Sequence, residues 1–401
     1  MNQLPPPPWG VIADDLTGAT DTAAAFARAG FSALVVLARR ARLPSADVLV
    51  LSTDSRHDTP QAARRKAMAA CRWLAQHQAV VLYKKMDSTL QGNIVPEVNA
   101  IRDAAGFATA LVCPANPKQG RSIRRGQLTV RGESRGSIAE HFAQQGLQNY
   151  ACLHLRLTEP LVERALAASR FVLADATLSR HLRVLAAAGI RRFPRVLLAG
   201  SAGLAAELAH ALVPMSRTLR RGSGPARQSQ QRTAPWPRPR RIRQQAPLPA
   251  LLLCGSANPV TVGQLQALVQ KGAARETQLG AQTLSAVRQM LLEGRSAIVH
   301  VPVHRRPDNE LVRELRGLSQ LLRERRVGSV LATGGDTALL VSRWLKPSAI
   351  DVTGEIVPGL ASGRLVGGLA GGLRFYTKPG GFGTPTSLLP LVAALGCEPH
   401  S

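Results

Sequence analysis

The sequence predicts an α/β protein with two lobes, each holding a mainly parallel sheet flanked by helices. Short apolar runs alternate with longer helix-like stretches, which is the order of a doubly wound sheet. Several apolar runs end in polar clusters, as strands do where a sheet meets a ligand. The pattern breaks off and later restarts, which predicts two domains at residues 8–214 and 250–398. Residues 215–249 are rich in Pro, Arg and Gln and are predicted to be a basic linker.

The first predicted strand ends in an acidic turn. An apolar run leads into Asp14 and Asp15, a Thr-Gly turn at Gly18 follows, and a helix is expected from Thr20 to Gly30. Two neighbouring carboxylates at the end of a strand can hold a cation or accept a hydroxyl proton. The same side chains can also simply cap the helix.

The other strands of the first lobe are also followed by polar residues. Strands are expected at residues 32–37, 48–51, 79–83, 109–113, 128–130, 151–155, 171–174 and 196–199, and helices at residues 59–77, 95–105, 138–144 and 204–212. Three of these strands lead to Arg56, to Lys85-Met86-Asp87-Ser88, and to Asn116, Lys118 and Arg121. Such groups at one sheet edge suit a small polyhydroxy carboxylate, although surface loops are polar in any case.

The second lobe repeats the alternation and adds glycine-bearing loops. Strands are expected at residues 250–254, 297–301 and 329–332 with a β-rich stretch near 352–376, and helices at residues 259–271, 309–325, 338–344 and 387–395. Three loops carry Ser256, Gly334-Gly335-Asp336-Thr337 and Gly380-Gly381. Glycine lets backbone N–H groups approach an anion, so the loops predict a phosphate site. Neither G-x-x-x-x-G-K-[ST] nor G-x-G-x-x-G is present. Two ligands would then meet in a cleft between the lobes.

Composition limits the classes of partner. The net charge of +26 favours anionic ligands, but the arginines are spread along the chain and aromatics make up only 4%, so nucleic acid is not the expected partner. The five cysteines are scattered without a C-x-x-C pair, which argues against a zinc site. No apolar run is long enough for a membrane helix, and the Pro-rich start lacks the form of a signal peptide. We therefore expect a cytoplasmic enzyme with no membrane partner. A homo-oligomer is left open.

The motifs resemble the four-carbon acid sugar kinase family in order along nearly the whole chain. The matching segments are Asp14-Asp15-Leu16-Thr17-Gly18-Ala19-Thr20-Asp21, Lys85-Met86-Asp87-Ser88-Thr89 with Gly92-Asn93, Gly334-Gly335-Asp336-Thr337, and Lys378-Pro379-Gly380-Gly381-Phe382-Gly383. The resemblance implies ATP-dependent phosphorylation of a tetronate or oxo-tetronate. Many members carry a basic residue where this chain has Gln91, and a Glu where it has Asp336.

The resemblance also implies roles for named residues. Those expected to bind the sugar acid are Asp14, Asp15, Arg56, Lys85, Met86, Asp87 and Ser88. Those expected to bind the nucleotide are Ser256, Gly334, Gly335, Asp336, Thr337, Gly380 and Gly381. Either Asp14 or Asp87 would be the catalytic carboxylate that orients or deprotonates the attacking hydroxyl. Mg²⁺ would bridge the phosphates with help from Asp336 or Glu355, but the metal ligands stay open. A non-catalytic sugar-acid sensor and a basic nucleic-acid-binding protein are the alternatives.

Overall fold

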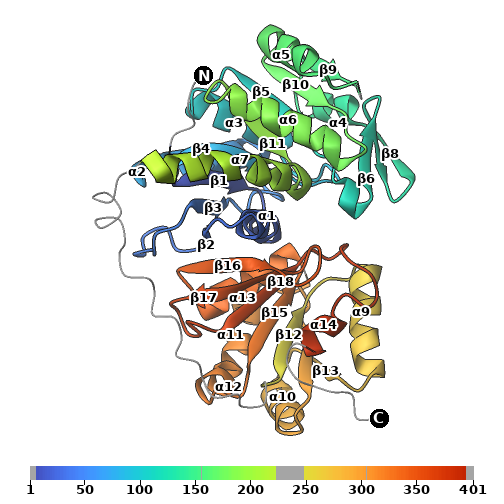
Figure 1. Cartoon of the computed structure of the whole chain (residues 1–401). Coiled ribbons are helices and arrows are strands. Elements are labelled where there is room, and N and C mark those ends of the chain that lie inside the picture. The colour runs from blue at the N-terminus through green and yellow to red at the C-terminus, as the bar shows by residue number, and fades with distance from the viewer. Residues whose placement is uncertain (1–5, 155, 223–247, 304, 394–401) are drawn as a thin grey trace. The chain divides into compact units, whose positions relative to one another are not determined.

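The computed structural model describes residues 6–154, 156–222, 248–303 and 305–393. The chain forms two compact units, one of residues 1–34 and 46–232 and the other of residues 35–45 and 233–401. Each is an α/β unit whose sheet is mainly parallel and flanked by helices, so the predicted fold class is confirmed (Figure 1). The segment 35–45, which lies within the first predicted domain, groups with the second unit. No helix in the described part of the chain has the length and hydropathy needed to cross a membrane.

The sheet of the first unit has the strand order β2-β3-β1-β4-β11-β5-β10-β9, and the pairings from β3 to β9 are parallel. Its strands are β1 (Trp9–Ala13), β2 (Ala33–Val36), β3 (Val48–Ser52), β4 (Val80–Lys85), β5 (Thr109–Cys113), β9 (Ala151–Leu153), β10 (Phe171–Ala174) and β11 (Val196–Gly200). Residues of β1, β5, β10 and β11 are buried throughout, which requires cover on both faces of the sheet. The carboxyl ends of these parallel strands therefore share one edge.

Helices provide that cover. They are α1 (Leu16–Arg28), α2 (Pro60–Gln76), α3 (Ile94–Ala104), α4 (Ile138–Gln144), α5 (Glu159–Ala168), α6 (Ser179–Arg191) and α7 (Ala202–Gly222). Helix α7 packs against α1 and α6, whereas α2 packs against α3, and Figure 1 shows α6 and α7 running across the sheet. Local capping fixes where the first two begin. The Asp15 carboxylate accepts the Gly18 N–H at 2.8 Å, and Thr59 caps α2 with Pro60 in its first turn.

The sheet of the second unit has the order β13-β14-β12-β15-β18-β17-β16. The first four pairings are parallel, and β17 pairs antiparallel with β18 and with β16. Its strands are β12 (Ala250–Cys254), β13 (Ala274–Gln278), β14 (Ser296–His300), β15 (Ser329–Thr333), β16 (Ala349–Glu355), β17 (Ala361–Val366) and β18 (Arg374–Lys378). Its helices are α9 (Pro259–Gln270), α10 (Thr283–Leu292), α11 (Asp308–Gly317), α12 (Ser319–Arg323), α13 (Gly335–Leu345) and α14 (Leu389–Ala393).

Several elements differ from the expectation. A separate antiparallel sheet, β6 (Arg121–Arg124), β7 (Gln127–Val130) and β8 (Glu133–Ser137), was foreseen only at β7. Helices α5, α6 and α10 and strand β13 were not predicted, and the single helix expected at residues 309–325 is two helices, α11 and α12. Helix α7 continues past Leu212 to Gly222. The rest of the predicted linker, up to residue 247, lies outside the described residues.

The positions of three lysines also correct the expectation, because the predicted strands stopped before them. Lys84, Lys85 and Lys378 lie at the ends of strands β4 and β18 and are almost fully buried. Lysine usually stays in water, so a sequence pattern ends a strand before it. Here carboxylates and carbonyl oxygens inside the fold receive the ammonium groups, as described below. The strands therefore extend further than their apolar runs.

Candidate functional site

Three neighbouring strands of the first unit bring an acidic cluster together. Asp14 and Asp15 follow β1, Arg56 lies just after β3, and Lys85 ends β4. Strands β3, β1 and β4 are adjacent and parallel, with Ala13 paired to both Ser52 and Lys85. Residues 42 positions apart in the chain thus lie side by side at the carboxyl edge of the sheet. These side chains were predicted to lie close together, and in the structure they do.

Arg56 joins the two carboxylates of the cluster. Its Nε donates to Asp14 Oδ2 at 2.8 Å, and its Nη2 lies 2.7 Å from the same oxygen. Its Nη1 lies 3.0 Å from Asp15 Oδ2. Burial alone would lower the pKa of Arg56, but Asp15, Asp14 and Asp87 outweigh it and raise that pKa. The guanidinium therefore stays charged and holds both acids in place.

Asp15 is a charged helix cap. Besides Arg56, it accepts the Thr17 hydroxyl at 2.6 Å and the Gly18 N–H at 2.8 Å. Burial would raise the pKa of Asp15, but Arg56, Lys85 and these hydrogen bonds lower it below its usual value. Both readings of the acidic turn thus apply to Asp15, which caps α1 and belongs to the cluster.

Asp14 differs from Asp15 in one oxygen. Its carboxylate is 3% exposed, and Oδ2 carries the contacts with Arg56. Among the described residues no group donates a hydrogen bond to Asp14 Oδ1, which is buried. A buried carboxylate oxygen without a donor is costly. An oxygen in that state is suited to accept a hydrogen bond from a ligand hydroxyl.

The loop after β4 completes the cluster. Lys85 Nζ donates to Met86 O at 2.8 Å, and a Cβ at position 18 would displace both Asp15 Oδ1, at 2.5 Å, and Lys85 Nζ, at 2.9 Å. Asp87 accepts the Thr89 hydroxyl with both oxygens, at 2.9 and 3.0 Å. The side chains of Met86 and Ser88 are buried.

Arg121, which comes after strand β5, is a further cation of the first unit. It is 5% exposed and follows the short turn after β5. Burial lowers the pKa of Arg121, whereas Asp87 and Asp21 raise it, so these acids lie within electrostatic reach. Asp87 also raises the pKa of Arg56. Asp87 therefore lies within electrostatic reach of two arginines, Arg56 after β3 and Arg121 after β5.

A buried ion pair stabilises the backbone beside this cluster. Sequence reasoning did not predict it. The Lys84 ammonium pairs with the Glu97 carboxylate of α3, and each side chain is 1% exposed. Ser55 donates to the other oxygen of Glu97, and the Ser55 N–H donates to Asp14 O at 3.0 Å. Glu97 thus fixes the residue before Arg56. The only signal in the sequence is an acid within a helix, which is common on exposed faces.

The second unit has its own site at the carboxyl edge of its sheet. A cavity of about 490 Å³ lies where β12, β13, β14 and β15 end. Four predicted nucleotide residues line it: Ser256, Gly334, Asp336 and Thr337. Gln278, His300, Val303 and Arg305 also line it and were not predicted. Gln278 was missed because β13 is polar, and His300 because it ends an apolar run.

The turn before α13 is built for a close approach by a ligand. Gly334 has φ +91°, which favours glycine, and Gly335 starts the helix. Thr337 Oγ1 accepts the Gly255 N–H at 3.1 Å, which ties this turn to the loop after β12. The N-terminus of a helix attracts anions because its first N–H groups are free of helical partners. The wall of the cavity is therefore suited to phosphate.

Gly380 and Gly381 adjoin the same wall. A Cβ added at position 380 would collide with Ser256 Oγ, and one at 381 would lie 3.4 Å from Asn258 Nδ2. The two glycines therefore pack against the loop that lines the cavity. All the predicted nucleotide residues lie on or beside the cavity wall. Glu355, which was named as a possible Mg²⁺ ligand, lies at the end of β16 and does not line the cavity.

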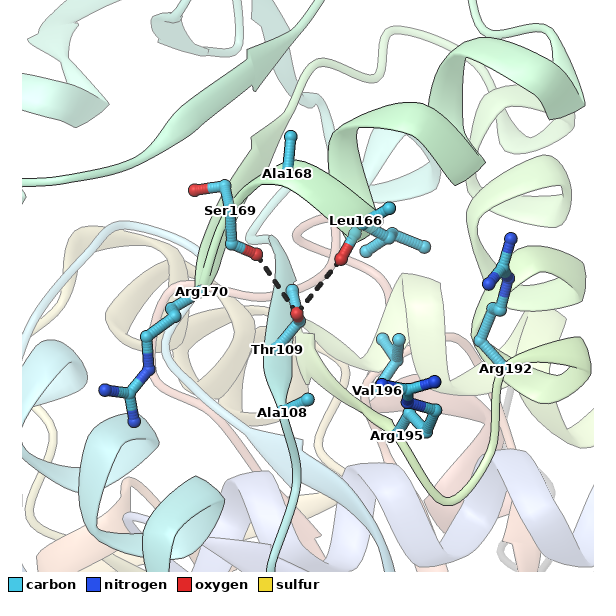
Figure 2. Close-up of a pocket in the computed structure, with 10 residues that line it drawn as sticks. Ala108, Thr109, Leu166, Ala168, Ser169, Arg170, Arg192, Arg195 and Val196 are labelled. Carbon is cyan, nitrogen blue, oxygen red and sulfur yellow. Dashed lines mark hydrogen bonds between the residues drawn. The ribbon is translucent and has the colours of Figure 1, made fainter.

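Another cavity lies at the amino edge of the first unit's sheet and holds none of the predicted residues. It measures about 330 Å³ and lies where β5, β10 and β11 begin. Figure 2 shows Thr109 donating its hydroxyl to Leu166 O and Ser169 O, and Arg170 and Arg192 pointing away from each other. Arg192 pairs with Glu163 at 2.9 Å. Ligands of parallel sheets bind at the opposite edge, so the acidic cluster remains the candidate.

Comparison with known proteins agrees with this division. A sugar-binding N-terminal domain family matches residues 9–151, and a nucleotide-binding C-terminal domain family matches residues 251–388. A D-threonate kinase of Bordetella bronchiseptica is 30% identical over 96% of this chain and 97% of its own length. A D-threonate kinase of Salmonella typhimurium is 28% identical over 94% of this chain and 96% of its own. A crystal structure from Salmonella typhimurium LT2, at 21% identity, has a TM-score of 0.72 with 95% of this chain and 98% of that chain covered, a likeness of fold alone.

Proposed function

The chain belongs to the four-carbon acid sugar kinase family and is a carbohydrate kinase, and we propose that it transfers the γ-phosphoryl group of ATP to the terminal hydroxyl of a four-carbon sugar acid. One observation carries the proposal. Each family domain contains one polar site at the carboxyl edge of its own parallel sheet, the acidic cluster in the sugar-binding part and the glycine-bordered cavity in the nucleotide-binding part. The proposal keeps the domain limits predicted from the sequence, residues 8–214 for the sugar acid and 250–398 for the nucleotide.

Asp14 is the proposed acceptor of the hydroxyl proton. The sequence left Asp14 and Asp87 as equal candidates. Both oxygens of Asp87 accept from Thr89, whereas Asp14 Oδ1 is buried and receives no hydrogen bond from the described residues. Arg56 holds Asp14 Oδ2 and so fixes the direction of Oδ1. An oriented carboxylate within reach of the attacking hydroxyl is what general base catalysis requires.

The cations of the cluster are proposed to hold the anionic end of the substrate. Lys85 and Arg56 lie beside the two acids, and Ser88 and Asp87 supply further hydrogen-bonding groups on the same turn. Arginine and lysine bind carboxylates through charge-assisted hydrogen bonds. A sugar acid would then present its carboxylate to the cations and its hydroxyl to Asp14. This arrangement discriminates sugar acids from neutral sugars.

The nucleotide is proposed to bind in the 490 Å³ cavity. The backbone N–H groups in the first turn of α13, which begins at Gly335, would meet the phosphates, with Ser256 and Thr337 beside them. Among the described residues no group of three or more His, Cys, Asp or Glu side chains is arranged to hold a metal ion. Mg²⁺ in kinases needs only one or two carboxylates besides the phosphates, so Asp336 on the cavity wall fits it. When bound, Mg²⁺ neutralises phosphate charge during transfer.

D-threonate is the first substrate to test, because the two relatives described above, which match nearly the whole chain, are D-threonate kinases. The experiment offers ATP and Mg²⁺ with D-threonate, the erythronates or 3-oxo-tetronate, and measures ADP release and the phosphorylated acid. ADP release with one acid and a phosphate ester on its terminal carbon is the expected result. Binding of a sugar acid without ADP release would instead identify a sensor and overturn the proposed function.

A further inference from the structure

Lys378 is buried among oxygen atoms of the chain itself. Its side chain is 1% exposed and ends strand β18. Its Nζ donates to the backbone oxygens of Pro379, Gly380 and Phe382 at 2.9, 3.2 and 3.2 Å, and to Thr261 Oγ1 at 3.1 Å. An ammonium group has three N–H donors. Four protein oxygens therefore already compete for them, and none is left for a phosphate.

These oxygens belong mainly to one loop, residues 379–384, which we call the glycine loop. Helix α9 holds the same loop from the other side. Thr261 Oγ1 donates to Gly380 O at 2.7 Å, and Gln264 Nε2 donates to Phe382 O at 3.1 Å and to Thr384 O at 2.7 Å. Glycines leave a loop with many accessible conformations. The side chains of Lys378, Thr261 and Gln264 thus hold this loop in a single conformation.

The glycine loop is connected to the cavity wall through the same residue. The backbone oxygen of Lys378 accepts the Gly334 N–H at 2.8 Å, so its main chain holds the turn before α13. Gly380 packs against Ser256, which lines the cavity. Lys378 thus contacts both glycine turns, one through its backbone and the other through its side chain.

We propose that Lys378 is a positioning residue that sets the shape of the glycine loop at the nucleotide cavity, and that it is not a ligand of the phosphates. The inference rests on the proposed function, because it assumes that the cavity takes ATP. Loss of the side chain removes one hydrogen bond from each of three carbonyl oxygens and loosens the loop. The affinity for ATP falls, while the sugar-acid site, which belongs to the other unit, keeps its properties.

The test compares Lys378→Met and Thr261→Val with Lys271→Met, an exposed lysine after α9 in the same unit. Lys378→Met should raise the KM for ATP by about tenfold or more, because hydrogen bonds from a charged donor are lost. Thr261→Val removes the neutral bond to Gly380 O and one of the four acceptors of the Lys378 ammonium, and it should raise the KM for ATP by about threefold. For both, the KM for the sugar acid should stay as in wild type, and Lys271→Met should change neither value.

Amide hydrogen exchange of residues 379–384 without ligand separates this inference from the proposed function. Exchange there should accelerate in Lys378→Met and Thr261→Val but not in Lys271→Met. Unchanged exchange overturns the inference, whether or not the wild type turns over ATP. Faster exchange with an unchanged KM for ATP overturns it as well, because the loop would not serve the nucleotide. A wild type that lacks ATP turnover refutes the proposed function instead. Should Lys378→Met fail to fold, Thr261→Val gives the same two readouts.

Discussion

The acidic cluster and the nucleotide cavity occupy equivalent edges of two parallel sheets but are built from different chemical groups. Around Asp14 the working groups are charged side chains, held by Arg56 and by the buried Glu97. In the cavity they are the backbone N–H groups at the start of α13, which follow a glycine turn that is held by Lys378. A small hydroxy acid needs directed side chains, whereas a phosphate chain can be bound by main chain alone. Substitutions should therefore affect the two regions in different ways.

The largest expected effect is at Asp14. Asp14→Asn keeps the size of the side chain but removes its capacity to take a proton, so kcat should fall by about 10²–10⁴-fold. Asp87→Asn, whose carboxylate is satisfied by Thr89, should change kcat by less than about tenfold. Asp103→Asn, a half-exposed acid paired with Arg102, is the matched control and should behave as wild type. Coupled ADP release measures all three. Equal losses in Asp14→Asn and Asp87→Asn would refute the assignment of Asp14.

The next effect is on stability. Glu97→Leu leaves Lys84 buried without its partner, which should lower the free energy of unfolding by about 3–5 kcal/mol. The variant also releases Ser55 and should raise the KM for the sugar acid but not for ATP. Chemical denaturation and steady-state kinetics measure the two effects. The double variant Lys84→Met with Glu97→Leu removes both charges and should recover most of the stability. Additive losses in the double variant would contradict a direct ion pair.

A smaller effect is expected at Gly334. Gly334→Ala places a side chain at φ +91°, and the strain should cost about 1 kcal/mol. The KM for ATP should rise about fivefold, because the strained turn displaces the start of α13, whose N–H groups are proposed to meet the phosphates. Gly272→Ala is the control, since it has φ +66°, open space around it and no place on the cavity wall. It should lose similar stability and keep its KM. A raised KM in Gly272→Ala would attribute the effect to stability alone.

The smallest effect is a dependence on pH. Burial lowers the pKa of Lys378 to about 8, with Cys254 acting in the opposite direction. Below that pH the ammonium has three N–H donors and above it the amine has two, so the glycine loop is held less firmly as pH rises. The KM for ATP should therefore rise by about two- to threefold through pH 8.

Two variants decide whether that step belongs to Lys378. It should be absent in Lys378→Met. Cys254 is the other titratable group beside the ammonium, and burial raises its pKa above the usual value. Cys254→Ser should keep the step, whereas a step that disappears with Cys254 would assign it to the thiol. Thr261 and Gln264, which also contact this region, carry no charge.

The sequence was most informative where apolar runs were strong. It predicted the buried strands of both units, and it assigned Asp14, Arg56 and Lys85 to one edge because parallel strands end together. It failed where a strand is polar. Strand β13 reads Ala-Arg-Glu-Thr-Gln at a sheet edge, and β8 is exposed for most of its length, so neither has the apolar residues that mark a strand. The residues of the cavity that lie near β13 were missed with it.

The chain itself determined the fold class, the order of the motifs and the family, because these depend on local apolar patterns and on short segments. Only the tertiary structure decided that Lys84 and Lys378 are buried, which oxygen of Asp14 is unengaged, and which residues hold the glycine loop. Each of these facts depends on contacts between residues far apart in sequence, such as Lys378 and Thr261 at a separation of 117 positions. A local pattern carries no information on such contacts, because a charge is stable in the interior only when it is paired, and its partner comes from another element of the fold.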